Sequence, residues 1–168
     1  MHALACVRKE TRILKIRNRA AALMLAALML FAATGAMAEG QKILLPDGTH
    51  TLTIPEEMSS QEPSSDEKDL KGIYLLPPDL EILVYAYPAQ GATAQVLAEA
   101  LVEAGRQAEV RDIGGTDFLV FQDRDESDGA YCVGYGYVAG EQLVEISFFY
   151  ATQAAADLTA VIMESFQE

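Results

Sequence analysis

The sequence contains no tryptophan, and it has little cysteine and histidine, the residues on which most zinc and thiol sites depend. Its 168 residues include two cysteines and two histidines, of which only Cys132 and His50 lie beyond residue 38. One histidine and one cysteine are too few for a zinc site or for a disulfide framework in that region. We therefore expect Cys132 to be a small buried side chain.

The common catalytic motifs are absent as well. The chain has no Cys-x-x-Cys pair, no Gly-x-Ser-x-Gly motif, no P-loop and no glycine-rich dinucleotide fingerprint. We predict that the protein is not an enzyme and that it has no catalytic residue and no cofactor. One alternative stays open, because two of the many carboxylates can be brought together by folding to form a hydrolase site.

Basic residues are scarce outside the first 38 residues. The whole chain has 12 Lys and Arg against 25 Asp and Glu. Subtracting the six basic residues and the one acidic residue of 1–38 leaves 6 basic and 24 acidic residues, a net charge of −18. Such a surface repels nucleic acid and anionic lipid headgroups, and it favours cations and basic partners. Direct nucleic-acid binding is therefore not expected.

Residues 1–38 have the composition of an export signal. A basic stretch precedes an apolar run at 20–33, and Ala36-Met37-Ala38 forms a small-residue cleavage site. The apolar run is short for a membrane span, which needs about 20 residues. We predict a cleaved signal peptide and a secreted or periplasmic protein that meets the membrane only during export. An uncleaved anchor and an organelle transit peptide are the alternatives.

Residues 130–152 hold the most regular pattern of the chain, two strands joined at Ala139-Gly140. In the first strand the tyrosines Tyr131, Tyr135 and Tyr137 share one face, and Gly134 shares the other with small residues. We expect a helix to pack over the glycine side. The tyrosine side is then either partly solvated or covered by a loop.

Two interpretations of the tyrosine side are open. Tyr131, Tyr135 and Tyr137 can be ordinary strand residues whose hydroxyls reach water. They can also form a platform for a ligand or a partner, and these three residues are our candidates for partner binding.

The remaining pattern predicts an α+β domain over residues 39–168. Its antiparallel sheet has about six to eight strands and is flanked by two amphipathic helices. Strands are expected at 42–45, 50–54, 72–76, 80–87, 108–113 and 116–122, with helices at 94–104 and 154–166. The polar segment 56–71 is expected to be a mobile acidic loop. In the first helix, Val96, Leu97, Ala100, Leu101 and Ala104 form the expected buried stripe.

The loop at 123–129 invites comparison with calcium sites. Asp123, Asp125 and Asp128 precede Gly129, but this glycine comes one residue late for an EF-hand, and Gly134 stands where the bidentate glutamate belongs. The loop is therefore not an EF-hand. The three aspartates remain weak candidates for a loose cation site, and a solvated turn is the alternative.

The segment Thr51-Leu52-Thr53-Ile54-Pro55-Glu56-Glu57-Met58 resembles the opening of PsbP-like domains, the extrinsic photosystem II subunit and its secreted bacterial relatives. Those domains typically carry an aromatic residue, often tryptophan, three residues after the proline, and here Met58 occupies that place. The later order of hairpin, helix, meander and C-terminal helix is also similar. The resemblance implies an antiparallel sheet flanked by helices and a mostly non-catalytic accessory role.

These observations together predict a secreted or periplasmic, non-catalytic binding or accessory protein. We expect it to be a protein-interaction module whose partner is a protein, with a basic protein as one option. A calcium-stabilised envelope protein and a carboxylate-based hydrolase are the alternatives.

Overall fold

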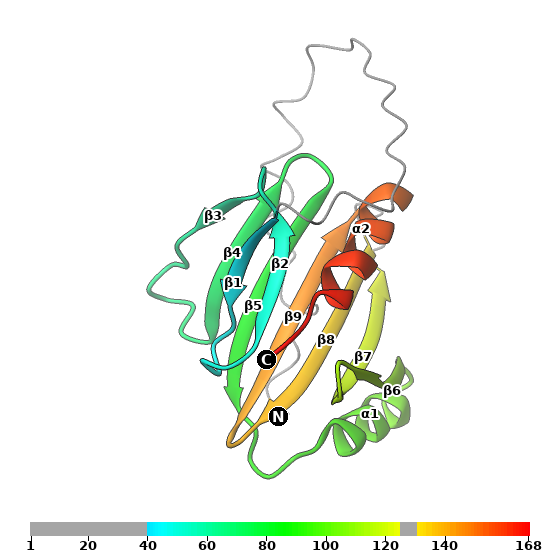
Figure 1. The fold of residues 1–168 in the computed structure, drawn as a ribbon. Coiled ribbons are helices and arrows are strands. Elements are labelled where there is room, and N and C mark those ends of the chain that lie inside the picture. Colours follow the sequence, from blue (N-terminus) through cyan, green and yellow to red (C-terminus); the bar gives the residue numbers. More distant parts are fainter. Residues whose placement is uncertain (1–39, 125–130) are drawn as a thin grey trace.

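The computed structural model describes residues 40–124 and 131–168, and it shows an α+β fold built on a seven-stranded antiparallel sheet (Figure 1). The predicted fold class is confirmed, whereas the predicted signal peptide lies outside the described residues. In spatial order the strands are β3 (Ser59–Gln61), β4 (Leu70–Leu76), β5 (Leu80–Pro88), β9 (Gln142–Tyr150), β8 (Tyr131–Ala139), β7 (Thr116–Arg124) and β6 (Gln107–Ile113).

A separate hairpin, β1 (Gly40–Leu44) and β2 (Thr51–Pro55), lies across one face of this sheet beside helix α2 (Gln153–Glu164) (Figure 1). The C-terminal tail forms backbone hydrogen bonds with β2. The Thr51 amide donates to the Gln167 carbonyl at 2.8 Å, and the Gln167 amide donates back to Thr51 at 3.2 Å. The two ends of the described chain therefore close over the same face of the sheet.

That face, which we call the hairpin face, carries the main core. Val133, Tyr135 and Tyr137 of β8 and Ile146 of β9 point into it, as their alternation predicts. Leu52 of β2 and Ile162 of α2 cover them, and both are 0% exposed. The hairpin face is thus sealed by segments that lie far from β8 in the sequence.

The opposite face, the glycine face, is packed by the neighbouring strand and by helix α1 (Ala94–Glu103). A Cβ atom at Gly134 would lie 2.1 Å from the ring of Phe121 on β7, so the ring occupies the space that a side chain would need. Ala94 and Ala98 of α1 pack against this ring. The expected helix is present on this face, but Phe121 fills the space above Gly134. Cys132 is buried here, as expected.

The buried stripe of α1 differs from the predicted one. Ala94 and Ala98 are buried, whereas Val96 is 54% exposed. The Thr93 side chain caps the helix by accepting a hydrogen bond from the Val96 amide at 3.3 Å. Leu97 and Leu101 of the predicted stripe are partly buried beside the two alanines. Because α1 packs mainly on β6, β7 and the adjoining part of β8, this narrow face covers the contact.

The segment 56–71 contains structure that its polar composition concealed. Strand β3 pairs with β4 although its three side chains are all exposed. Met58 is 4% exposed and belongs to the main core. Backbone pairing at a sheet edge needs no apolar side chain, so hydrophobic alternation cannot reveal such a strand.

Candidate functional site

The three tyrosines proposed as a platform do not share one environment. Tyr137 is 0% exposed and Tyr135 is 7% exposed, because the β1–β2 hairpin and α2 cover the hairpin face. The expectation of an accessible platform is therefore corrected for these two residues, and the face is covered by a hairpin and a helix, where the sequence suggested a loop. Tyr131 is 43% exposed at the end of β8, and its ring stacks on Tyr150 with a centroid distance of 5.9 Å. Only Tyr131 keeps a surface position.

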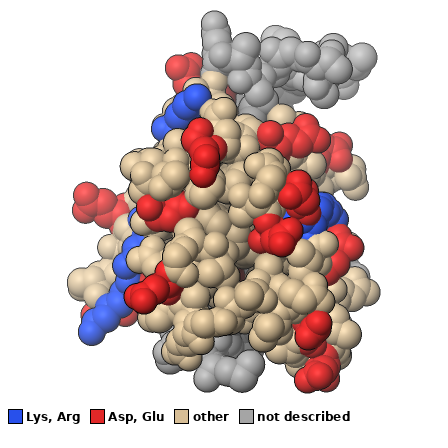
Figure 2. Space-filling view, turned by 60° about the horizontal axis from the view of Figure 1, so that its bottom comes forward, with Lys and Arg blue, Asp and Glu red and all other residues tan. Residues whose placement is uncertain are grey.

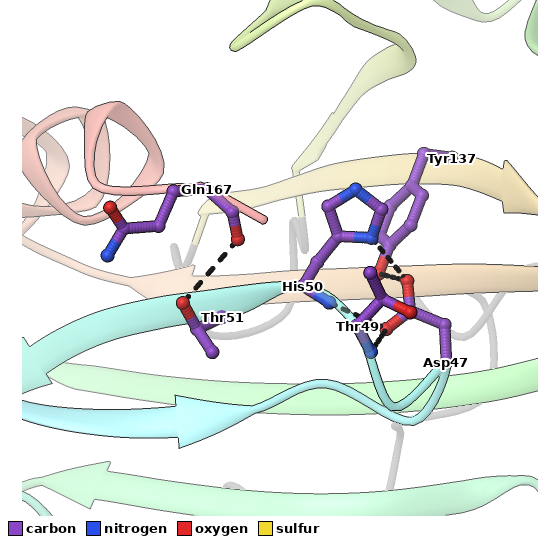
Figure 3. A network of polar contacts seen from close by, with 6 residues as sticks. All are labelled: Asp47, Thr49, His50, Thr51, Tyr137 and Gln167. Atoms are coloured by element: carbon purple, nitrogen blue, oxygen red, sulfur yellow. Dashed lines mark hydrogen bonds and ion pairs between the residues drawn. The ribbon is translucent and has the colours of Figure 1, made fainter.

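Tyr137 joins a polar cluster that we call the hairpin latch, formed by Asp47, His50 and Tyr137 (Figure 3). The Tyr137 hydroxyl donates to Oδ2 of Asp47 at 2.7 Å, and Nδ1 of His50 lies 2.5 Å from the same oxygen. Oδ1 of Asp47 accepts from the amides of Thr49 and His50, both at 3.1 Å. One carboxylate therefore closes the β1–β2 turn and fastens it to β8.

Aromatic rings enclose the latch. The His50 ring stacks on Phe166 at 4.7 Å and meets the edge of Tyr137 at 5.3 Å. The Asp47 side chain is 5% exposed and that of His50 is 14% exposed. The C-terminal tail, which carries Phe166, is thus part of the same packing unit as the first turn.

The surroundings of the latch shift two pKa values in opposite directions. Burial by itself would raise the pKa of Asp47, but hydrogen bonds from His50, Thr49 and Tyr137 outweigh it and hold this pKa below its usual value. Burial, together with the Asp47 carboxylate, raises the pKa of Tyr137 far above its usual value. Asp47 therefore stays ionised at neutral pH while the Tyr137 hydroxyl keeps the proton that it donates.

A carboxylate and an imidazole in contact resemble part of a general-base arrangement, but the surroundings of His50 do not complete one. Its ring faces Phe166 and Tyr137, and within the described residues no hydrogen bond links it to a serine or a cysteine. The contacts account for the cluster as a fastening between the hairpin and the sheet. Proline, aspartate and glycine at 46–48 are typical turn residues, but no local signal points to the partner Tyr137, which lies 90 residues away.

A shallow hollow of about 380 Å³ lies where the end of α1 meets β6 and β7. Its volume falls at the lower end of the range for ligand pockets. The guanidinium of Arg106 lies 5.3 Å from the centre of the Phe121 ring at this place. The lining residues are Val102, Arg106, Gln107, Ala108, Glu109, Val120, Phe121 and Gln122. Glu109 is the one carboxylate among them, so the hollow does not supply the pair of carboxylates that a hydrolase site needs.

A buried acid lies on the glycine face. Glu145 of β9 is 0% exposed, and Ser147 donates to its Oε1 at 2.6 Å. The two residues are separated by one position, so their side chains lie side by side on the same face of the strand. They share the odd-numbered positions of β9 with Leu143 and Phe149, which places all four on one face, but this pattern does not indicate that the acid is buried.

Comparison with solved structures identifies the architecture. The chain aligns with cyanobacterial PsbP (CyanoP) from Synechocystis sp. PCC 6803 with a TM-score of 0.58 and 13% identity, covering 83% of this chain and 98% of that one. The chain has a PsbP-like fold. A crystal structure from Bacteroides thetaiotaomicron VPI-5482 aligns with a TM-score of 0.56 and 14% identity over 76% of this chain, which spans about half of that protein (48%). No family model and no curated protein matches the sequence.

The PsbP-like fold explains the place of Met58. The resemblance put Met58 where such domains typically carry an aromatic residue, and here its side chain is 4% exposed within the main core. A long, flexible thioether can fill a space that an aromatic ring would otherwise occupy. Met58 is therefore a core residue of this chain.

The candidate cation ligands are only partly within the described residues. Asp123 lies in β7 opposite Cys132, whereas Asp125 and Asp128 lie outside the residues that the structure describes. Among residues 40–124 and 131–168, no three His, Cys, Asp or Glu side chains lie close enough to share a metal ion. No helix in that same part of the chain is long and apolar enough to cross a membrane.

Proposed function

We propose that this protein is a non-catalytic accessory protein that works outside the cytoplasm by binding another protein. The PsbP-like fold carries this proposal, because the alignment covers nearly the whole of a protein of that fold. The export-type composition of residues 1–38 supports the location.

The surface chemistry supports a partner with basic groups. Figure 2 shows acidic side chains spread over the face in view, with basic side chains confined to a few places at its margins. Acidic side chains of this kind steer a basic partner during encounter more than they add to final affinity. We therefore expect association that slows as the salt concentration rises.

Tyr131 is the contact residue that we propose. Its ring is 43% exposed and is supported from one side by Tyr150, so an aromatic anchor is held in place before a partner arrives. Aromatic residues are enriched in the cores of protein interfaces, and a pre-ordered ring loses little conformational entropy on binding.

Cross-linked affinity capture from the envelope and medium of the producing organism tests the proposal. The wild-type protein is compared with Tyr131→Thr and with Leu44→Thr, a matched change at another exposed apolar strand residue, which is 63% exposed. We expect one stoichiometric partner with wild type and with Leu44→Thr, and at least tenfold less of it with Tyr131→Thr. Equal capture by all three proteins would refute Tyr131 as a contact residue. Capture of no partner by folded wild-type protein would refute the proposal that the protein acts by binding another protein.

A further inference from the structure

Strand β6 forms one edge of the seven-stranded sheet, and on its outer side no other described strand pairs with it. It runs for seven residues, Gln107–Ile113, without proline or glycine. At the other edge, β3 is only three residues long. Natural sheets usually keep edge strands short or interrupt them, because a long edge is a template for pairing with another chain. The length of β6 therefore needs an explanation.

The turn after β6 determines which backbone groups face outward. Ile113 pairs with Thr116 across Gly114 and Gly115, whose φ values are 62° and 83°, as a two-residue hairpin turn requires. In such a turn the flanking pair exchanges its backbone hydrogen bonds, and hydrogen-bonded pairs alternate along the ladder. The odd-numbered residues of β6 therefore bond to β7. The amides and carbonyls of Ala108, Val110 and Asp112 point to the open edge.

The charged side chains of β6 match those of a second β6 strand that runs antiparallel to it. In an antiparallel pair of two β6 strands centred on Val110, Glu109 lies opposite the partner's Arg111, and Arg111 lies opposite the partner's Glu109. These are the pairs without backbone hydrogen bonds, in which side chains approach most closely. Both side chains are available, since those of Arg111 and Glu109 are 53% and 61% exposed.

We propose that β6 binds β6 of a second copy of this chain, forming a twofold dimer with one continuous sheet. The outward groups of Ala108, Val110 and Asp112 supply the backbone hydrogen bonds, and the two Glu109–Arg111 pairs set the register. In the single chain Glu109 and Arg111 already form an ion pair with each other, and pairing lets each of them contact the partner as well. The contact involves one strand from each copy, so the dimer is weak and concentration-dependent.

Charge reversal separates this dimer from nonspecific association. The protein is purified from the organism that produces it. Its sedimentation velocity is then measured at concentrations from micromolar to millimolar. Arg111→Glu and Glu109→Arg each place like charges opposite one another in a homodimer, and each should weaken self-association about tenfold or more. An equimolar mixture of the two variants should dimerise again, because every cross-strand pair is then of opposite sign. Lys68→Glu is the control for Arg111→Glu, because it makes the same change of charge in the loop before β4.

Amide hydrogen exchange tests the same geometry without substitutions. The amides of Glu109 and Arg111 should exchange slowly at every concentration because they bond to β7. The amides of Ala108, Val110 and Asp112 should become protected only as the concentration rises. A monomer throughout the concentration range would overturn the proposal. So would a dimer that both charge reversals leave intact, or one in which these three amides stay unprotected.

Discussion

The two faces of the seven-stranded sheet are closed in different ways. On the glycine face the residue that fills the gap comes from the adjacent strand, since Phe121 of β7 lies over Gly134 of β8. On the hairpin face the cover comes from both ends of the described chain, with Leu52 and Ile162 meeting over β8 and β9. Closure by an adjacent strand depends on the register between neighbours in the sheet, whereas closure by the hairpin and the C-terminal segment depends on how the whole chain packs.

The Asp47–Tyr137 hydrogen bond belongs to the second kind of closure. It spans 90 residues, and the bond from the Thr53 amide to the Ser165 hydroxyl spans 112. Such contacts form only after most of the chain is ordered. We therefore expect truncation of side chains to lower the free energy of unfolding most on the hairpin face. Enlargement of side chains should lower it most on the glycine face.

Truncation on the hairpin face should have the largest effect. Ile162→Ala removes a side chain that is 0% exposed between α2 and the sheet, and should lower the free energy of unfolding by about 2–5 kcal/mol. Urea denaturation monitored by circular dichroism measures the change. Val96→Ala, on the 54% exposed side of α1, is the control and should change stability by less than about 0.5 kcal/mol. Similar effects at both sites would contradict the assignment of the core.

Enlargement on the glycine face should have the next largest effect. Gly134→Ala puts a Cβ atom 2.1 Å from the buried Phe121 ring and should cost about 1–3 kcal/mol. Gly136→Ala is the matched control, because its Cβ would lie 3.5 Å from Leu143, an ordinary contact. Adding Phe121→Leu to Gly134→Ala should cost less than the sum of the two single changes in the same denaturation assay. Strict additivity would show that Phe121 does not fill the space above Gly134.

Loss of the latch hydroxyl should have a smaller effect. Tyr137→Phe keeps the ring in the core and removes the donor to Asp47, which should cost about 1 kcal/mol. Combining Tyr137→Phe with Asp47→Asn in a double-mutant cycle measures the coupling between the two side chains. A coupling energy of zero would show that the hydrogen bond does not stabilise the hairpin on the sheet.

The pH dependence of the latch should be the smallest effect. The pKa of Asp47 is lower in the folded chain than its usual value near 4, so its contribution to stability is present above that value. The contribution is lost as the pH falls through the folded pKa of Asp47. The difference in unfolding free energy between wild type and Asp47→Asn should therefore narrow between about pH 5 and pH 2. A difference that stayed constant over this interval would contradict the lowered pKa.

Local patterns in the sequence were sufficient for much of the fold. Alternation placed Tyr135 and Tyr137 on one face and Gly134 on the other, and helical spacing located α1. Strand β3 was missed because its three exposed polar residues have no hydrophobic alternation. The buried stripe of α1 was misjudged because propensity and periodicity do not say how much of a helix a sheet edge covers.

The candidate site was predicted less well. Tyr131 was correctly placed on a strand, but nothing in its neighbours distinguished its exposed ring from the buried ring of Tyr137. Asp47 lies between the strands expected at 42–45 and 50–54, and its link to Tyr137 needed the tertiary structure. Binding by Tyr131 stays a prediction, and so does the loose cation site at Asp123, Asp125 and Asp128.

The sequence by itself determined which side chains share a face of β8 and β9, where the turns fall and how acidic the surface is. These properties depend on neighbours a few residues apart and on composition alone. Only the tertiary structure decided that the tyrosine face is covered, that Asp47 meets Tyr137 and that β6 is left as a long edge. The first two outcomes depend on how segments 90 or more residues apart pack together. The third depends on how the whole sheet is assembled, and no local period in the sequence carries that information.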